Sequence, residues 1–164
     1  MDWFAGHSWA SGIANGAGGR DQESTTEAIN GYYGLLLFAT VTNNQALVSY
    51  ARMLIAIEVA GAQTYWHLYP SVNDSNTPYP EQAFRDLITV GNVMDTQAGA
   101  WLFWGAQRIQ IAAIQILPVT PMGQYTYDSA WMQNVVPYCQ KELDDNSLGD
   151  DFKSGKIELR LFIS

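Results

Sequence analysis

The sequence has one cysteine and few basic residues, and these two shortages exclude several kinds of protein. Cys139 cannot form a disulfide within the chain, and we expect this lone thiol, next to a Pro-Tyr pair, to be packed inside the protein. Eight Lys and Arg residues stand against 16 Asp and Glu, which gives a net charge of -8. No basic cluster is present to neutralise phosphates, so nucleic acid is not an expected partner.

Long apolar runs and a targeting leader are also missing. The longest apolar runs, 32–41 and 53–57, are shorter than the roughly 20 residues that cross a bilayer, so no membrane span is expected. The start, Met1-Asp2-Trp3, has neither the basic region nor the apolar region of a secretory signal. The aspartates near the C-terminus lack the ligand spacing of an EF-hand, and we expect neither a metal nor a cofactor.

What is present is the composition of a globular protein, since 48% hydrophobic residues in 164 are enough for one core. Apolar positions at three- and four-residue spacing predict an all-α fold of antiparallel helical hairpins. Residues 109–117 fit either a strand or a buried helix, and residues 141–164 form a predicted polar tail after a domain over 1–140. The predicted helices cover 25–40, 44–67, 81–94, 96–104 and 129–136.

Two carboxylates lie four residues apart where the first helix should begin. Ser24 and Glu27 fit a capping box, with Asp21 as a rival cap. The positive end of the helix dipole favours ionised carboxylates at Glu23 and Glu27, whereas their mutual repulsion would raise one pKa. Two interpretations remain open. Either Glu27 is only a cap partner and Glu23 only a solvated residue, or the two carboxylates form a catalytic pair.

Aromatic residues are concentrated at the start of the chain and at the end of the second predicted helix. Trp3, Phe4 and Trp9 are either core anchors or flat platforms that stack on sugar rings. Gln63 and His67 share a helix face with Trp66 beside them, a position for contacts to a polar ligand or for a structural histidine.

Other residues of the first two helices carry structural expectations. Glu58, within the apolar part of the second helix, is expected to face solvent. Gly31 and Gly34 would lower the stability of the first helix unless they allow a close helix contact.

Two stretches closely resemble the endo-1,3-β-glucanases of glycoside hydrolase family 81. They are Asp-Trp-Phe-Ala-Gly-His-Ser-Trp-Ala-Ser-Gly at 2–12 and Gln-Glu-Ser-Thr-Thr-Glu-Ala-Ile-Asn at 22–30, and similarity continues to about residue 131. The resemblance implies part of an (α/α)6 toroid and inverting hydrolysis of internal bonds in β-1,3-glucan. It also implies an extracellular or cell-wall location.

The resemblance also implies roles for single residues. Glu23 would be the general base that activates water, and Glu27 its supporting carboxylate. The aromatic residues Trp3, His7, Trp9 and Trp66 would line the glucan cleft, with Gln63 and His67 as further candidate contacts.

The chain departs from the family pattern in ways that leave alternatives open. The family's general acid is an Asp in an Asp-x-x-x-His segment, which this sequence does not contain. We therefore expect the acid in a missing upstream part of the same catalytic domain. Asp21 stands where the family commonly has Asn. A non-catalytic β-glucan-binding protein is the alternative function, and a truncated product that does not fold stably is a third possibility.

Overall fold

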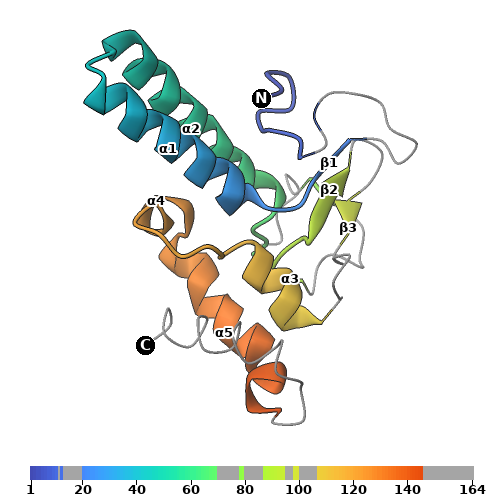
Figure 1. Cartoon of the computed structure of the whole chain (residues 1–164). Helices are drawn as coiled ribbons and strands as arrows, with labels where there is room; N and C mark the ends of the chain where they lie inside the picture. Colours follow the sequence, from blue (N-terminus) through green and yellow to red (C-terminus); the bar gives the residue numbers. More distant parts are fainter. Residues whose placement is uncertain are drawn as a thin grey trace.

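Two long antiparallel helices, α1 (Thr25–Val41) and α2 (Gln45–Tyr65), form a hairpin that projects from one side of the molecule (Figure 1). The computed structural model describes residues 1–10, 12, 20–69, 78–79, 87–94, 98–99 and 107–145. The two helices confirm the predictions for 25–40 and 44–67 within one or two residues.

Side-chain caps define where both helices begin. The hydroxyl oxygen of Ser24 accepts a hydrogen bond from the backbone N–H of Glu27 at 3.3 Å, and Asn44 Oδ1 accepts one from Leu47 at 3.1 Å. Each bond satisfies a backbone donor that has no partner within the helix. Between the helices the chain reverses through Asn43, whose φ of 53° lies in the left-handed region that asparagine tolerates.

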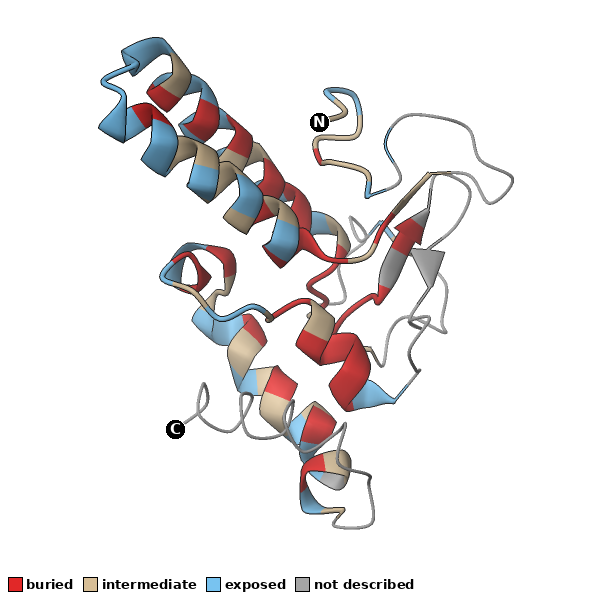
Figure 2. Cartoon of the chain, viewed as in Figure 1, coloured by how far each residue is buried: buried red, intermediate tan, exposed pale blue. Residues whose placement is uncertain are grey.

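The hairpin is buried along one stripe and exposed along the rest, as Figure 2 shows. Small and aliphatic side chains fill the space between the helices: Ile29, Ala39, Val48, Ala51 and Leu54. Apolar side chains on the outer faces are exposed: Leu37, Phe38, Val41, Tyr50 and Met53. By length and composition alone, α2 is a candidate to cross a membrane, a test that core helices of soluble proteins also pass.

Gly61 on α2 lies against the N-terminal segment, and this close approach was not predicted. A Cβ built at Gly61 would lie 2.9 Å from the carbonyl oxygen of Gly6 and 3.1 Å from His7 Cβ. In contrast, a Cβ at Gly31 or Gly34 would have no neighbour within 4 Å. The glycines of α1 therefore do not serve a close helix contact, whereas Gly61 does.

This contrast gives a matched pair of variants. Gly31→Ala should stabilise the fold by about 1 kcal/mol, the difference between alanine and glycine in a helix. Gly61→Ala gains the same helix preference but meets a backbone carbonyl, and overpacking typically costs about 1–3 kcal/mol. Urea denaturation should therefore place Gly61→Ala about 1–3 kcal/mol below Gly31→Ala. Equal stability of the two variants would show that the N-terminal segment yields freely.

A small antiparallel sheet lies beside the base of the hairpin, in addition to the helices that the predicted all-α fold anticipated. Its strands are β1 (Asp21–Gln22), β2 (Asn92–Met94) and β3 (Ala98–Gly99), in the order β1-β2-β3. Asp21 pairs with Met94, and Asn92 pairs with Gly99. Helices were predicted over 81–94 and 96–104. Where the structure describes these ranges, 92–94 and 98–99 are strands, so the two helix predictions are wrong there. The fold is thus mostly helical with a small sheet.

Three further helices complete the described part of the chain. They are α3 (Arg108–Ile114), α4 (Gly123–Thr126) and α5 (Ser129–Asp144), and α3 resolves the ambiguity over 109–117 in favour of a helix. Helix α5 extends past Pro137, beyond the predicted end at 136, and past residue 140 of the predicted domain boundary. The rest of the predicted tail, 146–164, lies outside the described residues.

A core cluster joins α3 to α5. Its buried members are Ile88, Ile109, Ala112, Ile116, Trp131, Val135, Cys139 and Leu143. Cys139 is a free, buried thiol, as predicted, and its burial raises its pKa to about 12. A second cluster of Trp66, Leu68, Val90 and Val93 packs under the N-terminal segment through Trp9.

Candidate active site

Glu23 lies just outside α1, between the end of β1 and the capping residue Ser24. Ser24 has an extended backbone, with φ of -131° and ψ of 96°, so the helical geometry that would align Glu23 with Glu27 does not yet hold at Glu23. Glu27 is the acidic residue of the first helical turn and is exposed, whereas Glu23 is half-buried. The two carboxylates thus occupy different environments at the same helix start.

Gln115 fixes the backbone on both sides of Ser24. Its Nε2 donates to the carbonyl oxygen of Glu23 at 2.6 Å, and its Oε1 accepts from the hydroxyl of Thr25 at 3.0 Å. Gln115 is fully buried, so each of its bonds replaces one that water would otherwise make. The amide therefore holds the main chain of Glu23 in one place while leaving its carboxylate unbound by Gln115.

The start of α1 is further tied to the segment after α3. The hydroxyl of Thr26 donates to the carbonyl oxygen of Leu117, and the hydroxyl of Thr120 donates to Asn30 Oδ1 at 2.7 Å. Pro118 follows Leu117 through a cis peptide bond. Residues 114–120 thus cover the first turns of α1 from outside.

The surroundings of Glu23 raise its pKa above the ordinary value. Partial burial is the largest cause, followed by the negative charges of Asp21 and Glu27. Of the two opposing effects expected at the helix start, the repulsion between carboxylates agrees with this raised pKa, since Glu23 precedes the helix and has two acidic neighbours. A carboxylate with a raised pKa is a stronger base when ionised, and general bases work best with a pKa near the working pH.

Replacing Asp21 with asparagine tests this electrostatic coupling. A carboxylate base works only when ionised, so under the base role expected for Glu23 activity should rise as the pH increases through its pKa. Asp21→Asn removes one like charge, lowers the pKa of Glu23, and should move the acidic limb of the pH profile of glucan hydrolysis to lower pH. Asp144→Asn, at the exposed end of α5, is the control and should leave the limb in place. If the acidic limb of Asp21→Asn does not shift, the charge of Asp21 does not control the pKa of Glu23.

The N-terminal segment, residues 2–10, carries the aromatic residues of the candidate site. Asp2 shapes its turn by accepting backbone hydrogen bonds from Phe4 at 2.9 Å and Ala5 at 3.1 Å. Asp2 Oδ2 also accepts from Trp9 Nε1 at 2.9 Å. The indole bond, followed by these backbone bonds, lowers the pKa of Asp2. The turn is therefore closed around an aspartate that sequence reasoning did not single out.

Trp9 and His7 are held in an aromatic arrangement over the end of α2. The two rings meet edge to face with centroids 4.4 Å apart, and His7 also meets the rings of Tyr65 at 5.5 Å and Trp66 at 5.1 Å. The guanidinium of Arg20 lies 5.2 Å from the Trp9 ring centroid. His7 itself is only 2% exposed, so its part in the site is to support Trp9.

Hydrogen bonds connect this aromatic segment to the strand that precedes Glu23. The backbone N–H of Ala10 donates to the carbonyl oxygen of Asp21 at 2.7 Å, and Gln22 Nε2 donates to the hydroxyl of Ser8 at 2.8 Å. Glu58 accepts from Ser8 and Gln22 and is fully buried, which contradicts the expectation that it faces solvent. Trp9 and Glu23 are thereby brought to the same part of the molecule.

The remaining predicted contacts are less accessible. Trp66 is fully buried, and His67 is 2% exposed with its ring stacked on Trp131 at a centroid distance of 3.8 Å. Burial lowers the pKa of His67 to about 3, so its ring is neutral near neutral pH. Gln63 donates from Nε2 to the carbonyl oxygen of Thr126 at 3.3 Å, which joins α2 to α4. Trp66 and His67 therefore offer little surface to a ligand, whereas Gln63 is half-buried.

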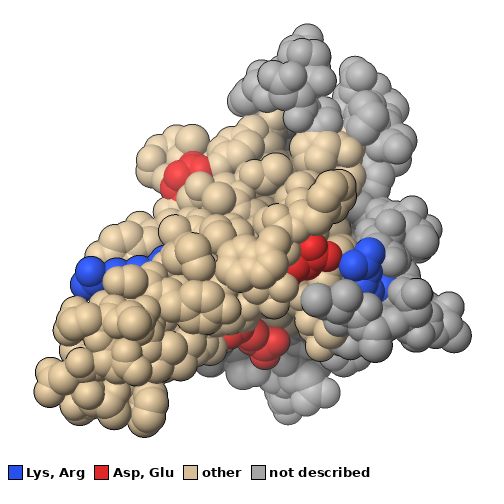
Figure 3. All heavy atoms as spheres, turned by 90° about the horizontal axis from the view of Figure 1, so that it is seen from above, with Lys and Arg blue, Asp and Glu red and all other residues tan. Residues whose placement is uncertain are grey.

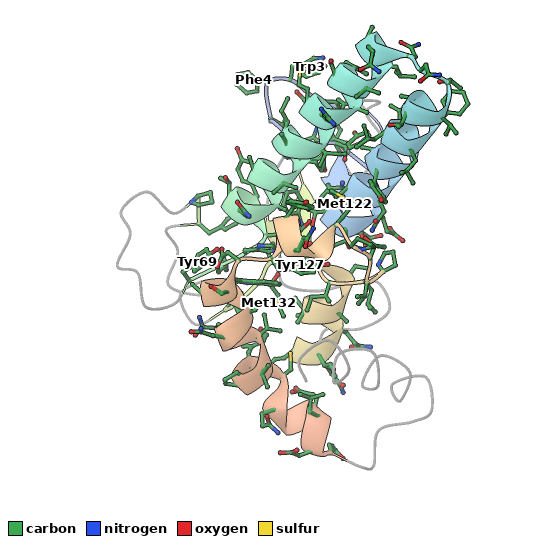
Figure 4. All side chains as sticks on the ribbon, turned by 90° about the vertical axis from the view of Figure 1, so that its left-hand side faces the viewer. Trp3, Phe4, Tyr69, Met122, Tyr127 and Met132 are labelled. Atoms are coloured by element: carbon green, nitrogen blue, oxygen red, sulfur yellow. The ribbon has the colours of Figure 1, made fainter. Side chains whose placement is uncertain are left out.

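Two aromatic side chains, in contrast, are open to solvent. Trp3 is 58% exposed and Phe4 is fully exposed, and both project from the turn away from the body of the molecule (Figure 4). Seen from above, the described surface is largely uncharged, and its blue spheres form no basic cluster (Figure 3). Aromatic faces on a mostly uncharged surface suit a neutral ligand such as a sugar chain better than a polyanion.

Comparisons with known proteins identify the family of this chain. Residues 1–153 match the Glycosyl hydrolase family 81 C-terminal domain. The chain is 28% identical to a glucan endo-1,3-beta-D-glucosidase of Glycine max over 93% of this chain and 23% of that protein. It is 32% identical to glucan endo-1,3-beta-D-glucosidase 2 of Saccharomyces cerevisiae over 73% of this chain and 15% of that protein.

A solved structure shares the fold. A glycoside hydrolase family 81 protein from Clostridium thermocellum superposes with a TM-score of 0.68 and 23% sequence identity, covering 97% of this chain and 21% of that one. The chain therefore spans less than a quarter of the length of the relatives it matches. With its family motifs and its fold in agreement, this chain belongs to glycosyl hydrolase family 81, within the C-terminal domain.

Proposed function

We propose that this chain is part of the catalytic domain of an endo-1,3-β-glucanase, with Glu23 as the general base and Glu27 as its supporting carboxylate. One observation carries the proposal: in a chain of this family, Glu23 is half-buried with a raised pKa, and its backbone is fixed by Gln115. The substrate would be β-1,3-glucan, since the relatives are named glucan endo-1,3-beta-D-glucosidases.

In the proposed mechanism Glu23 takes a proton from a water molecule, and that water attacks the anomeric carbon from the face opposite the leaving group. The product then has the inverted configuration. An inverting glycosidase also needs a protonated carboxylic acid about 6.5–9.5 Å from the base, which donates a proton to the departing glycosidic oxygen. The negative charges of Asp21 and Glu27 both raise the pKa of Glu23. In the proposed mechanism, Glu23 therefore holds the proton that it takes from water more tightly.

We further propose that the general acid comes from a region outside this chain. The sequence contains no Asp-x-x-x-His segment, because neither His7 nor His67 follows an aspartate at that spacing. The chain also spans less than a quarter of its relatives' length, which leaves room for an acid elsewhere. Without that acid, turnover should fall by about 10²–10⁴-fold, the usual contribution of general acid catalysis.

Two measurements test the proposal. Calorimetry with laminari-oligosaccharides measures whether the chain binds β-1,3-glucan. A reducing-sugar assay measures laminarin hydrolysis by the chain alone and by a longer form that includes residues encoded upstream of Met1. We expect turnover only in the extended form. Ordinary turnover by the chain alone would contradict an acid supplied from outside. Proton NMR of the freshly released sugar gives its anomeric configuration, and hydrolysis with retention would contradict the base role.

A non-catalytic glucan-binding protein is the second candidate, and the exposed side chains of Trp3 and Phe4 favour it. Aromatic rings open to solvent are suited to stacking on sugar rings whether or not a bond is cleaved. Measurable affinity with no hydrolysis in the extended form would favour this candidate. The absence of any affinity would argue against both functions.

A further inference from the structure

Glu58 is a buried carboxylate to which no role has been assigned. It lies in the middle of α2, is fully buried, and has apolar neighbours along its helix. Burying a carboxylate is strongly unfavourable unless hydrogen bonds replace its lost contacts with water. A fold that retains such a group must therefore satisfy it closely.

Three hydrogen bonds satisfy it, and all three come from other segments. The backbone N–H of Ser8 donates to Oε2 at 2.8 Å, and the Ser8 hydroxyl donates to Oε1 at 2.8 Å. Gln22 Nε2 donates to Oε1 at 3.3 Å, and to the Ser8 hydroxyl oxygen at 2.8 Å. Glu58 is the acceptor in all three of these bonds.

The positions of these donors connect Glu58 to both halves of the candidate site. Ser8 stands between His7 and Trp9, and Gln22 directly precedes Glu23. Nearby, Gly61 touches the backbone of the same N-terminal segment one turn further along α2. One carboxylate on a rigid helix thus contacts the segment with the aromatic residues and the strand that ends at the proposed base.

We propose that Glu58 is a positioning residue that fixes the distance between the Glu23 carboxylate and the aromatic segment around Trp9, and so sets how a glucan chain lies relative to the base. This inference rests on the proposed function for Glu23 as the base, and on the expectation from the family resemblance that Trp9 lines the glucan cleft. Glu58 touches neither; it acts through Ser8 and Gln22. Gln115 holds the other side of Glu23, so the base is fixed from two directions.

The test compares Glu58→Ala with Val135→Ala, a truncation in the core cluster of α3 and α5, far from these hydrogen bonds. Carbon-detected NMR titration follows the Glu23 carboxyl, and calorimetry measures affinity for laminari-oligosaccharides. Glu58→Ala should weaken binding about tenfold or more and shift the titration of Glu23. Val135→Ala should change neither, although it also lowers stability. Glu58→Gln, which keeps one acceptor oxygen, should lie between Glu58→Ala and the unmodified chain.

The outcomes separate this inference from the proposed function. Identical Glu23 titration and affinity in folded Glu58→Ala and Val135→Ala would overturn the positioning role. If the unmodified chain binds no laminari-oligosaccharide, the proposed function fails. The NMR titration then still tests the inference, because an unchanged Glu23 titration in Glu58→Ala would show that Glu58 does not position Glu23. If Glu58→Ala does not fold, Ser8→Ala decides, because it removes only the hydroxyl; a Glu23 titration like that of the unmodified chain would count against the proposal.

Discussion

Glu23→Gln should abolish most of the glucan hydrolysis of an active form that contains this chain, with turnover lowered about 10²–10⁴-fold. Glutamine has nearly the shape of glutamate but cannot accept a proton from water. The hydrogen bond from Gln115 reaches the carbonyl oxygen of residue 23, so the backbone position should survive the substitution. Affinity for laminari-oligosaccharides should therefore remain close to that of the unmodified enzyme.

The same variant should be more stable than the unmodified protein near neutral pH. The pKa of Glu23 is raised by folding, so its contribution to stability is fully present below the ordinary value of 4.5 and is lost as the pH rises through the folded-state pKa. Ionised Glu23 therefore destabilises the fold, and the neutral amide removes that effect. Thermal melts should show a higher midpoint for Glu23→Gln near neutral pH and a smaller difference below 4.5.

Opposite changes in activity and stability distinguish a functional carboxylate from a structural one. Asp144→Asn, at the exposed end of α5, makes the same chemical change away from the site and should leave turnover unchanged. Unchanged turnover in Glu23→Gln would remove Glu23 from the base role. A loss of turnover together with a loss of stability would point instead to damage of the fold.

Trp131→Ala should have the largest effect on stability, a loss of about 3–5 kcal/mol. The indole is fully buried, stacks on His67 with an angle of 13° between the rings, and donates from Nε1 to the carbonyl oxygen of Ile88 at 2.8 Å. Truncation leaves a cavity and removes one of the two donors to the Ile88 carbonyl, which also accepts from the backbone N–H of Leu68 at 2.7 Å. Because whole domains are stable by only about 5–15 kcal/mol, this variant should be partly unfolded at modest urea concentrations.

Trp3→Ala is the matched control, since it makes the same substitution at a side chain that is 58% exposed. Its urea midpoint should stay near that of the unmodified chain, while its affinity for laminari-oligosaccharides should fall if Trp3 stacks on sugar. Trp131→Phe keeps an aromatic ring but loses the indole N–H that bonds Ile88, and its urea midpoint should lie between those of Trp131→Ala and the unmodified chain. Equal urea midpoints for Trp131→Ala and Trp3→Ala would contradict the core that joins α3 and α5.

The elements with strong local signals were predictable from the sequence. Ser24 caps α1 as its capping pattern indicated, and the apolar spacing predicted both α1 and α2. The residues of β2 were predicted as a helix because their apolar positions also fit a helical spacing. What decides their structure is pairing with Asp21–Gln22, about seventy positions earlier, which no local pattern reports. Helix α5 continues through Pro137, an exposed position where water can bond the carbonyl that proline leaves free.

The candidate site was predictable in its motif but not in its supports. The spacing of the carboxylates and the resemblance to a known family both indicated Glu23 and Glu27 as candidate site residues. The burial of Glu58 depends on Ser8, 50 residues earlier in the chain, and spacing along α2 could not show which face Ser8 covers. Likewise, the burial of Trp66 and His67 follows from packing against the N-terminal segment and α5, so residues that looked available for a ligand became part of the core.

The hold of Gln115 on Glu23, across 92 positions of sequence, determines when the base can acquire its geometry during synthesis. The α1–α2 hairpin has mainly local contacts and can form while the ribosome is still adding later residues. The start of α1 stays open until residues 114–120 have emerged and closed a long loop, a step that is slow because of its chain entropy. The proposed catalytic centre therefore acquires its fixed backbone only after residues 114–120 have been synthesised.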